Sequence, residues 1–292
     1  MFSLIQAKIL CCICLFSFAI WFLVEDLKAS VPFSSGCMGN DLLKNPYFVT
    51  PPNDFNRSIS MENAEFAPEN WSWGLRGYAW DTSTLTQCPI TECAFSSKGI
   101  PNDYDVWLYG KDDSGGIGVV TLIQGWVWQS SSPPAGWYLF SPQSVSNVTD
   151  MTVQAWIKHR GGHYPETKTD MLRNGIIDIW MRDESSGKIL MMDLLFFGHS
   201  NSWKEDNIYH YAANVADVPE DKWTEVEVNV DDCVDHAIAE AAKEGMSFEK
   251  KNLKICQVEI LEELRHAWGE LWIGSFAFTY CSLPLSEKFS IQ

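Results

Sequence analysis

The sequence predicts an all-β protein, a two-sheet antiparallel sandwich or jelly roll with one short helical insert. Two observations lead to this prediction. Segments with alternating apolar and polar side chains recur along the chain, and turns rich in Gly, Pro and Asn separate them. The sequence has no internal repeat and no low-complexity tract, so residues 31–292 are predicted to form a single domain.

The predicted strands are short and regularly spaced, as in two-layer β proteins. Two of them, residues 175–182 and 189–197, flank the turn Asp183–Gly187 and are predicted to form a β-hairpin. The full set of predicted strands is Leu42–Val49, Val106–Tyr109, Val119–Val127, Tyr138–Phe140, Met151–Lys158, Gly175–Arg182, Ile189–Phe197, Trp223–Val230, Leu253–Leu261 and Gly269–Tyr280. Residues 51–70, 81–104 and 159–170 are predicted as loops.

One segment, Val234–Glu244, has the alanine-rich composition of a helix. Asp231 or Asp232 is predicted to cap its N-terminus, and Gly245 is predicted to end it.

The N-terminal segment resembles an export signal. Lys8 precedes an apolar run, Ile9–Val24, that is shorter than the roughly 20 residues of a transmembrane helix and close to the roughly 7–15 of a signal-peptide core. The small residues Ala29 and Ser30 follow it. Residues 1–30 are therefore predicted to be a signal peptide or an uncleaved signal anchor. The protein is predicted to be secreted or anchored at the cell surface, and to contact a membrane only if residues 9–24 remain as an anchor.

After residue 30 the chain contains an even number of cysteines, which in an exported protein predicts disulfides. They are Cys37, Cys88, Cys93, Cys233, Cys256 and Cys281. Proximity in the chain favours the pairs Cys88–Cys93 and Cys233–Cys256, which leaves Cys37–Cys281, although the sequence alone does not select the connectivity. Since this part of the chain has no Cys-x-x-Cys pair and no ligand spacing among its histidines, no metal site is expected.

Three Asn-x-Ser/Thr sequons, at Asn56, Asn70 and Asn147, are predicted glycosylation sites and agree with export.

The net charge of −17 makes nucleic acid an unexpected partner, because an acidic chain repels phosphate backbones. The 14 tryptophans indicate either a heavily aromatic core or surfaces that stack on flat ligands.

Period-two alternation places tryptophans among polar side chains on two predicted strands. Gln154 and Trp156 share one face of their strand, and Asp178, Trp180 and Arg182 share one face of theirs. Indole rings beside carboxylate, amide and guanidinium groups are typical of sugar sites, so these five residues predict a ligand face for a glycan or polysaccharide. The alternative is that a loop or helix covers the tryptophans as part of a second core.

An enzymatic function is the second possibility. Glycoside cleavage uses two opposed carboxylates, and Asp178 with Asp193 or with Glu262 could supply them. The alternative for these acids is an ordinary ion pair with Arg182 or Arg265. The sequence contains no Gly-x-Ser-x-Gly nucleophile elbow. A third possibility is an extracellular structural or surface protein with no small ligand.

Several motifs resemble carbohydrate-binding modules with a galactose-binding-like jelly roll. These are the opening 40–48 (Asn-Asp-Leu-Leu-Lys-Asn-Pro-Tyr-Phe), Pro-Glu-Asn-Trp at 68–71, Tyr-Leu-Phe-Ser at 138–141, the strand 153–158 and the closing segment 271–276. The resemblance implies non-catalytic, lectin-like glycan binding, which is the main prediction. Because Val49 stands where such modules often carry an acid that helps to bind calcium, no cofactor is expected.

The helical insert is similar to larger jelly-roll glycoside hydrolases and lyases, which keeps the enzymatic alternative open. One such family carries its nucleophile four residues before a strand tryptophan. Counting back from Trp180, that position is Ile176 in this chain, so this match is absent.

Overall fold

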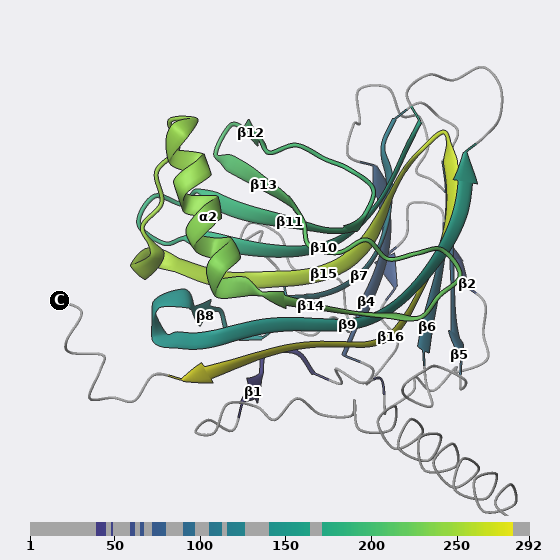
Figure 1. The fold of residues 1–292 in the computed structure, drawn as a ribbon, viewed down its shortest axis with the longest axis horizontal. Coiled ribbons are helices and arrows are strands. Elements are labelled where there is room, and N and C mark those ends of the chain that lie inside the picture. Colours follow the sequence, from purple (N-terminus) through teal and green to yellow (C-terminus); the bar gives the residue numbers. More distant parts are fainter. Residues whose placement is uncertain are drawn as a thin grey trace, which may run out of the picture. The chain divides into compact units, whose positions relative to one another are not determined.

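The computed structural model describes residues 39–44, 48, 59–61, 65–66, 72–79, 90–96, 105–112, 116–125, 140–163 and 171–282. These residues form two β-sheets that pack face to face, with one α-helix at an edge (Figure 1). The predicted fold class, a two-sheet sandwich or jelly roll with a helical insert, is confirmed.

The strand order of each sheet is known within the described part of the chain. The seven-stranded sheet runs β14 (Thr224–Asn229), β9 (Val148–His163), β16 (Ala267–Ser282), β6 (Asp105–Asp112), β5 (Ile90–Ser96) and β2 (Ile59–Met61), and β1 (Asn40–Asp41) pairs with β16. The nine-stranded sheet runs β12 (Trp203–Glu205), β13 (Ile208–Asn214), β11 (Ile189–Phe197), β10 (Leu172–Asp183), β15 (Leu253–Arg265), β7 (Gly118–Gly125), β4 (Gly74–Ala79) and β3 (Glu65–Phe66), and β8 (Gln143–Ser144) pairs with β15. Two short 3-10 helices are η2 (Val145–Asn147) and η3 (Lys250–Asn252).

The predicted hairpin is confirmed, because β10 and β11 pair antiparallel around the turn at residues 184–187. Other strand predictions need correction. Residues 42–44 form a bend instead of a strand, and β9 continues to His163 through residues predicted as a loop. Strands β2 to β5, β12 and β13 were not predicted, since their short segments lack clear alternation. One pairing, β11 with β13, is parallel, so the sandwich is not purely antiparallel.

The core lies between the two sheets and follows the alternation of their strands. Ile177 and Ile179 of β10 belong to the same continuous apolar cluster as Val153 and Ile157 of β9. In the same cluster the fully buried indole of Trp73 stacks on a phenylalanine ring of β16. Burial of this apolar area is the main stabilising term.

The helix α2 (Val230–Lys243) covers one edge of the sandwich, beside β9, β11 and β13 (Figure 1). Its cap is Asn229, whose side chain accepts the backbone N–H of Asp232. The predicted cap at Asp231 or Asp232 is wrong because β14 runs directly into the helix, so the last extended residue takes the cap position. Gly245 adopts a left-handed φ of 78° just after the helix, as predicted for its stop.

The cysteine prediction is partly wrong. Cys233 and Cys256 are free thiols. Cys233 lies on α2 and packs against the main core, whereas Cys256 lies in a separate apolar cluster on the opposite face of the nine-stranded sheet, so the two do not meet. Cys281 is disulfide-bonded. Cys37 and Cys88 lie outside the described residues, as does the side chain of Cys93.

The predicted signal segment, residues 1–30, and the sequons at Asn56 and Asn70 also lie outside the described residues. Asn147 is exposed in η2, and its glycosylation stays a prediction. Among the described helices, none is long and apolar enough to span a membrane.

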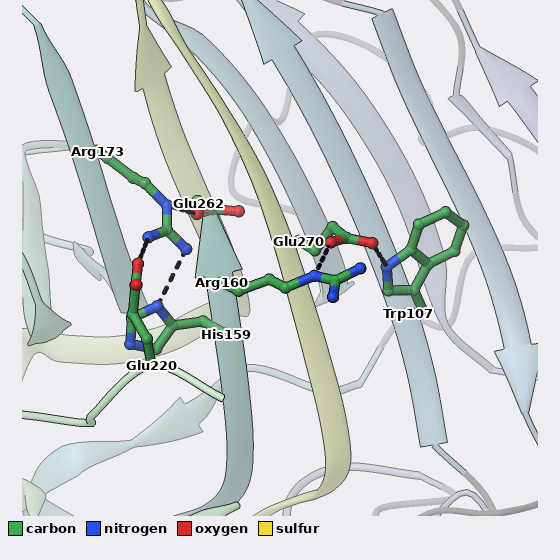
Figure 2. A network of polar contacts seen from close by, with 7 residues as sticks. All are labelled: Trp107, His159, Arg160, Arg173, Glu220, Glu262 and Glu270. Carbon is green, nitrogen blue, oxygen red and sulfur yellow. Dashed lines mark hydrogen bonds and ion pairs between the residues drawn. The ribbon is translucent and has the colours of Figure 1, made fainter. Parts of the chain in front are cut away.

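Arg173 of β10 and Glu262 of β15 form a buried ion pair on the core side of the nine-stranded sheet (Figure 2). The guanidinium of Arg173 on β10 donates to Glu262 Oε1 at 2.6 Å and to Glu220 Oε1 at 2.7 Å. It also donates to His159 Nδ1 at 3.0 Å. The imidazole Nε2 of His159 in turn donates to a backbone carbonyl, that of Val218. Because burial lowers the pKa of His159, its neutral form with a bare Nδ1 acceptor is favoured.

Two glycines, Gly161 and Gly269, make room for this pair, and a third extends their row across the sheet. Gly161, Gly269 and Gly110 lie opposite one another on β9, β16 and β6. A Cβ atom at Gly161 would collide with Arg173, and one at Gly269 would collide with Glu262. The row of glycines therefore lets the two sheets approach closely where the ion pair lies.

We expect Arg173→Met to lower the free energy of unfolding by about 3–5 kcal/mol at pH values well above 7, because it leaves the carboxylate of Glu262 buried without its cation. The matched control is Arg160→Met. Arg160 pairs with Glu270 on the other sheet with half of its side chain exposed, so its loss should cost at most about 1 kcal/mol. Denaturant unfolding of both variants measures the difference, and equal losses would contradict a special role for the buried pair.

We also expect stability to fall as pH rises. Burial raises the pKa of Glu262 to about 7, although the charge of Arg173 opposes the shift. The folded protein thus binds this proton more tightly than the unfolded chain does, and the stabilisation is complete below the unfolded pKa and lost as pH passes about 7.

Unfolding midpoints measured between about pH 5 and pH 8 test this expectation, and Glu262→Gln should flatten the slope by up to about 1.4 kcal/mol per pH unit. The control for the loss of one carboxyl group is Glu227→Gln, on the exposed side of β14. A slope that is identical in wild type and Glu262→Gln would contradict the assignment.

Candidate active site

The face of the nine-stranded sheet that points away from the core, here called the cleft face, carries a row of buried acids. On β10, Ile177 and Ile179 enter the core, so Ile176, Asp178 and Trp180 point to the cleft face. Cross-strand register places Asp193 of β11 and Glu259 of β15 directly opposite Asp178. Three carboxyl groups therefore lie side by side on three adjacent strands.

A cavity of about 410 Å³ opens on this face and is called the acidic cleft. It is lined by the acids Asp178, Asp193, Glu205 and Glu263, the bases His199, His210 and Arg265, and the polar or apolar residues Asn174, Ser200, Ile117, Leu172, Ile176, Met191 and Trp203. Such a mixture of titratable and apolar walls is typical of ligand and active sites.

Asp178 and Asp193 lie directly opposite each other in the strand register, and both line the cleft. Burial, followed by the negative charges of Asp193 and Glu259, raises the pKa of Asp178 well above its usual range. Burial also raises the pKa of Asp193, but His210, whose Nδ1 lies 3.5 Å from Asp193 Oδ2, opposes that shift. Asp178 is thus the member that holds its proton more firmly, and Asp193 is the member that ionises more readily.

Glu263 supplies a third carboxyl group. Its Oε2 accepts a hydrogen bond from Asn174 Nδ2 at 3.1 Å, and Asn174 Oδ1 in turn accepts the backbone N–H of His199. Burial raises the pKa of Glu263 to about 7. Glu263 therefore changes its protonation state near neutral pH, as an acid–base catalyst must.

Glu259 has a different environment from the other acids. Its carboxylate accepts hydrogen bonds from Trp180 Nε1 at 2.9 Å, Thr121 Oγ1 at 2.9 Å and Gln257 Nε2 at 3.0 Å. It is not among the residues that line the cleft. Three donors hold this carboxylate beneath the cleft, where it fixes the indole of Trp180.

The structure separates the residues predicted to form one sugar-binding face. Asp178 lies in the acidic cleft, and Trp180 is buried with 2% of its surface exposed. Arg182 lies at the far end of β10, beside the turn. Gln154 and Trp156 lie on β9 in the other sheet, where Gln154 bonds to Glu225. The two strands do not pair with each other, because β9 pairs with β14 and β16, whereas β10 pairs with β11 and β15.

The alternative catalytic set is partly brought together. Asp178 and Asp193 meet in the cleft, but Glu262 points to the opposite side of β15, toward Arg173. The neighbouring Glu263 lies in the cleft instead. Sequence reasoning did not single out Glu263, nor His210 and Trp203 on the unpredicted β13 and β12. Ile176, at the position of the nucleophile in one jelly-roll hydrolase family, is buried in an apolar cluster on the cleft face.

Among the described residues, no group of three or more His, Cys, Asp or Glu side chains is arranged to hold a metal ion.

Comparison with known proteins adds information on the fold. No protein-family model and no curated protein matches the sequence. Among solved structures, the chain is similar to a native family 12 xyloglucanase from Bacillus licheniformis, with 11% identity and a TM-score of 0.51 over 77% of this chain and 100% of that one.

Two further structures resemble it less well. A metagenome-derived glycoside hydrolase family 12 endoglucanase has 14% identity and a TM-score of 0.47, over 78% of this chain and 100% of that one. A family 11 xylanase from Neocallimastix patriciarum has 8% identity and a TM-score of 0.44, over 76% of this chain and 99% of that one. Identities this low, taken with the TM-score of the xyloglucanase, establish a shared jelly-roll fold and nothing finer.

Proposed function

We propose that the protein is a polysaccharide-degrading glycoside hydrolase whose active site is the acidic cleft. One observation carries the proposal. The carboxyl groups of Asp178, Asp193 and Glu263 line the same cavity, and their surroundings give them different affinities for protons. Glycoside hydrolysis needs such a pair, one carboxyl group that keeps its proton and one that is ionised.

Glu263 is the proposed general acid. With a pKa of about 7, it holds a proton at mildly acidic pH and can release it to the glycosidic oxygen. The hydrogen bond from Asn174 fixes the direction of its carboxyl group. As the bond between the anomeric carbon and this oxygen breaks, the oxygen keeps the electron pair and takes the proton of Glu263, so the leaving sugar departs as an alcohol.

Asp193 is the proposed general base. A water molecule attacks the anomeric carbon and passes one proton to the Asp193 carboxylate. Asp178, which keeps its proton, lies opposite Asp193 on the neighbouring strand, and His210 supports the ionised form of Asp193. Overall one water is consumed, and the two carboxyl groups have exchanged protonation states, which solvent then resets.

The proposed roles require water as the attacking group and place the two acids at different positions along the strands. Glu263 lies four residues beyond Glu259, the residue opposite Asp178, which is about 13 Å along β15. In a single displacement, water attacks the anomeric carbon from the side opposite the leaving sugar, so hydrolysis by these roles inverts the anomeric configuration. Proton NMR of the first products reads the configuration directly.

Glycans are the proposed substrates, and the shared fold guides the choice of test polymers. The similar structures include a xyloglucanase, a xylanase and an endoglucanase, so xyloglucan, xylan and soluble cellulose derivatives form a rational first panel. The main prediction from sequence, non-catalytic glycan binding through Trp156 and Trp180, loses its support because these residues lie on different sheets.

A location outside the cytosol is part of the proposal. A disulfide at Cys281 is expected mainly in oxidising compartments, and the sequon at Asn147 lies on the exposed surface. A secreted enzyme would also meet its polymeric substrates there.

We expect Glu263→Gln to lower kcat on the polysaccharide by about 100-fold or more, because the amide cannot protonate the leaving oxygen. The control is Glu227→Gln, on the exposed side of β14 in the other sheet, which should stay within about threefold of wild type. Release of reducing sugar measures both. Equal losses in the two variants would contradict the assignment of the acid to Glu263.

The pH profile gives an independent test. Because the acid must be protonated, kcat/KM should fall as pH rises above about 7, the pKa of Glu263. The residual activity of Glu263→Gln should lack this falling limb. A limb that persists unchanged in the variant would assign the essential proton to another group.

A further inference from the structure

An exposed tryptophan lies at the rim of the acidic cleft. Among the described residues, Met171 and Trp203 are the large apolar side chains with substantial exposure, 42% each, and Trp203 lines the cavity. Trp203 begins β12, the outermost strand of the nine-stranded sheet within the described part of the chain. The two residues that follow it on the strand are Lys204 and Glu205, the charged types usual for an edge strand, so the indole is the exception.

The indole is held in a fixed orientation. His210 lies opposite Trp203 in the strand register, and the two rings stack with centroids 3.8 Å apart and an interplanar angle of 11°. His210 is itself 1% exposed and contacts Asp193 at 3.5 Å. One face of the indole is therefore supported by a buried imidazole, and a ligand that uses the exposed part meets a surface that is already ordered.

The indole and the carboxyl groups belong to one cavity. Trp203, His210, Asp193 and Glu263 all line it. A flat apolar plate beside hydrogen-bonding carboxylates matches the two surfaces of a pyranose, whose ring C–H groups stack on an indole and whose hydroxyls bond to acids.

We propose that Trp203 is a binding platform on which one pyranose ring of a glycan stacks, next to the ring that lies among the carboxyl groups of the cleft. The proposal rests on the proposed function, since it places this ring in the same cleft. It assigns Trp203 a role in binding and none in the chemical step.

Binding to a slowed enzyme tests the platform directly. In the Glu263→Gln background, cellohexaose and xylohexaose are titrated by calorimetry and by tryptophan fluorescence. We expect Trp203→Ala to weaken binding of the hexasaccharide that binds by about tenfold or more, since it removes the stacking surface. Trp203→Phe should retain binding within about threefold while losing the fluorescence change, because a phenyl ring still stacks.

The matched control is Trp223→Ala in the same background. Trp223 is half-buried, and the ammonium group of Lys158 on the seven-stranded sheet lies over its ring. Because Trp223 does not line the acidic cleft, its loss should leave binding unchanged. With the active enzyme, Trp203→Ala should raise KM by about tenfold and change kcat by less than about threefold. Unfolding midpoints of all variants check that the fold is retained.

The outcomes separate this proposal from the proposed function. If wild type hydrolyses a polysaccharide and Trp203→Ala leaves KM and hexasaccharide binding unchanged, the platform is overturned and the hydrolase stands. If no polymer is hydrolysed but a hexasaccharide binds and Trp203→Ala abolishes binding, the platform stands and hydrolysis fails. Equal weakening by Trp223→Ala, or no binding of either hexasaccharide, also overturns the platform.

Discussion

The buried pair of Arg173 and Glu262 is the constraint on which the rest of the site depends. A carboxylate between two sheets is costly unless a cation meets it, and Arg173 meets it at 2.6 Å. The pair is possible only because Gly161 and Gly269 leave the space that it fills. Since successive side chains on a strand point to opposite faces, an inward Glu262 forces Glu263 outward into the acidic cleft. The packing of the two sheets thus determines which carboxyl group is available for chemistry.

The same desolvation that destabilises the folded protein prepares the cleft for catalysis. Asp178, Asp193 and Glu263 each bind protons more tightly than in water, because burial penalises their charged forms. A sheet built only for stability would not place Asp193, Asp178 and Glu259 opposite one another on three strands. Stability sacrificed in this way, at one cavity, is typical of active sites, where strained or costly groups persist because function requires them.

Sequence alternation predicted part of this arrangement, and its failures have definite causes. The hairpin of β10 and β11, predicted from the turn Asp183–Gly187, brings Asp178 opposite Asp193. A simple period of two did not predict whether Glu262 or Glu263 points into the cleft. A register shift between Trp180 and Met181 interrupts the β10–β15 pairing, so the alternation at one end of β15 does not continue to the other end. His210 and Trp203 were missed because β13 joins the sheet by a parallel pairing with β11, which local sequence does not encode.

The tryptophan content predicted a glycan ligand without identifying which indoles are available to it. On the seven-stranded sheet, Lys158 Nζ lies 4.1 Å from the ring centre of Trp272, and Arg160 also lies over that ring. Cations of the same sheet thus occupy this indole. Trp180 is likewise occupied, since it is buried and donates to Glu259. Trp203 differs because its partner, His210, supports the ring from within the cleft and leaves part of it exposed. Exposure beside carboxyl groups, and not the number of tryptophans, is therefore the property that distinguishes a candidate sugar platform from packing.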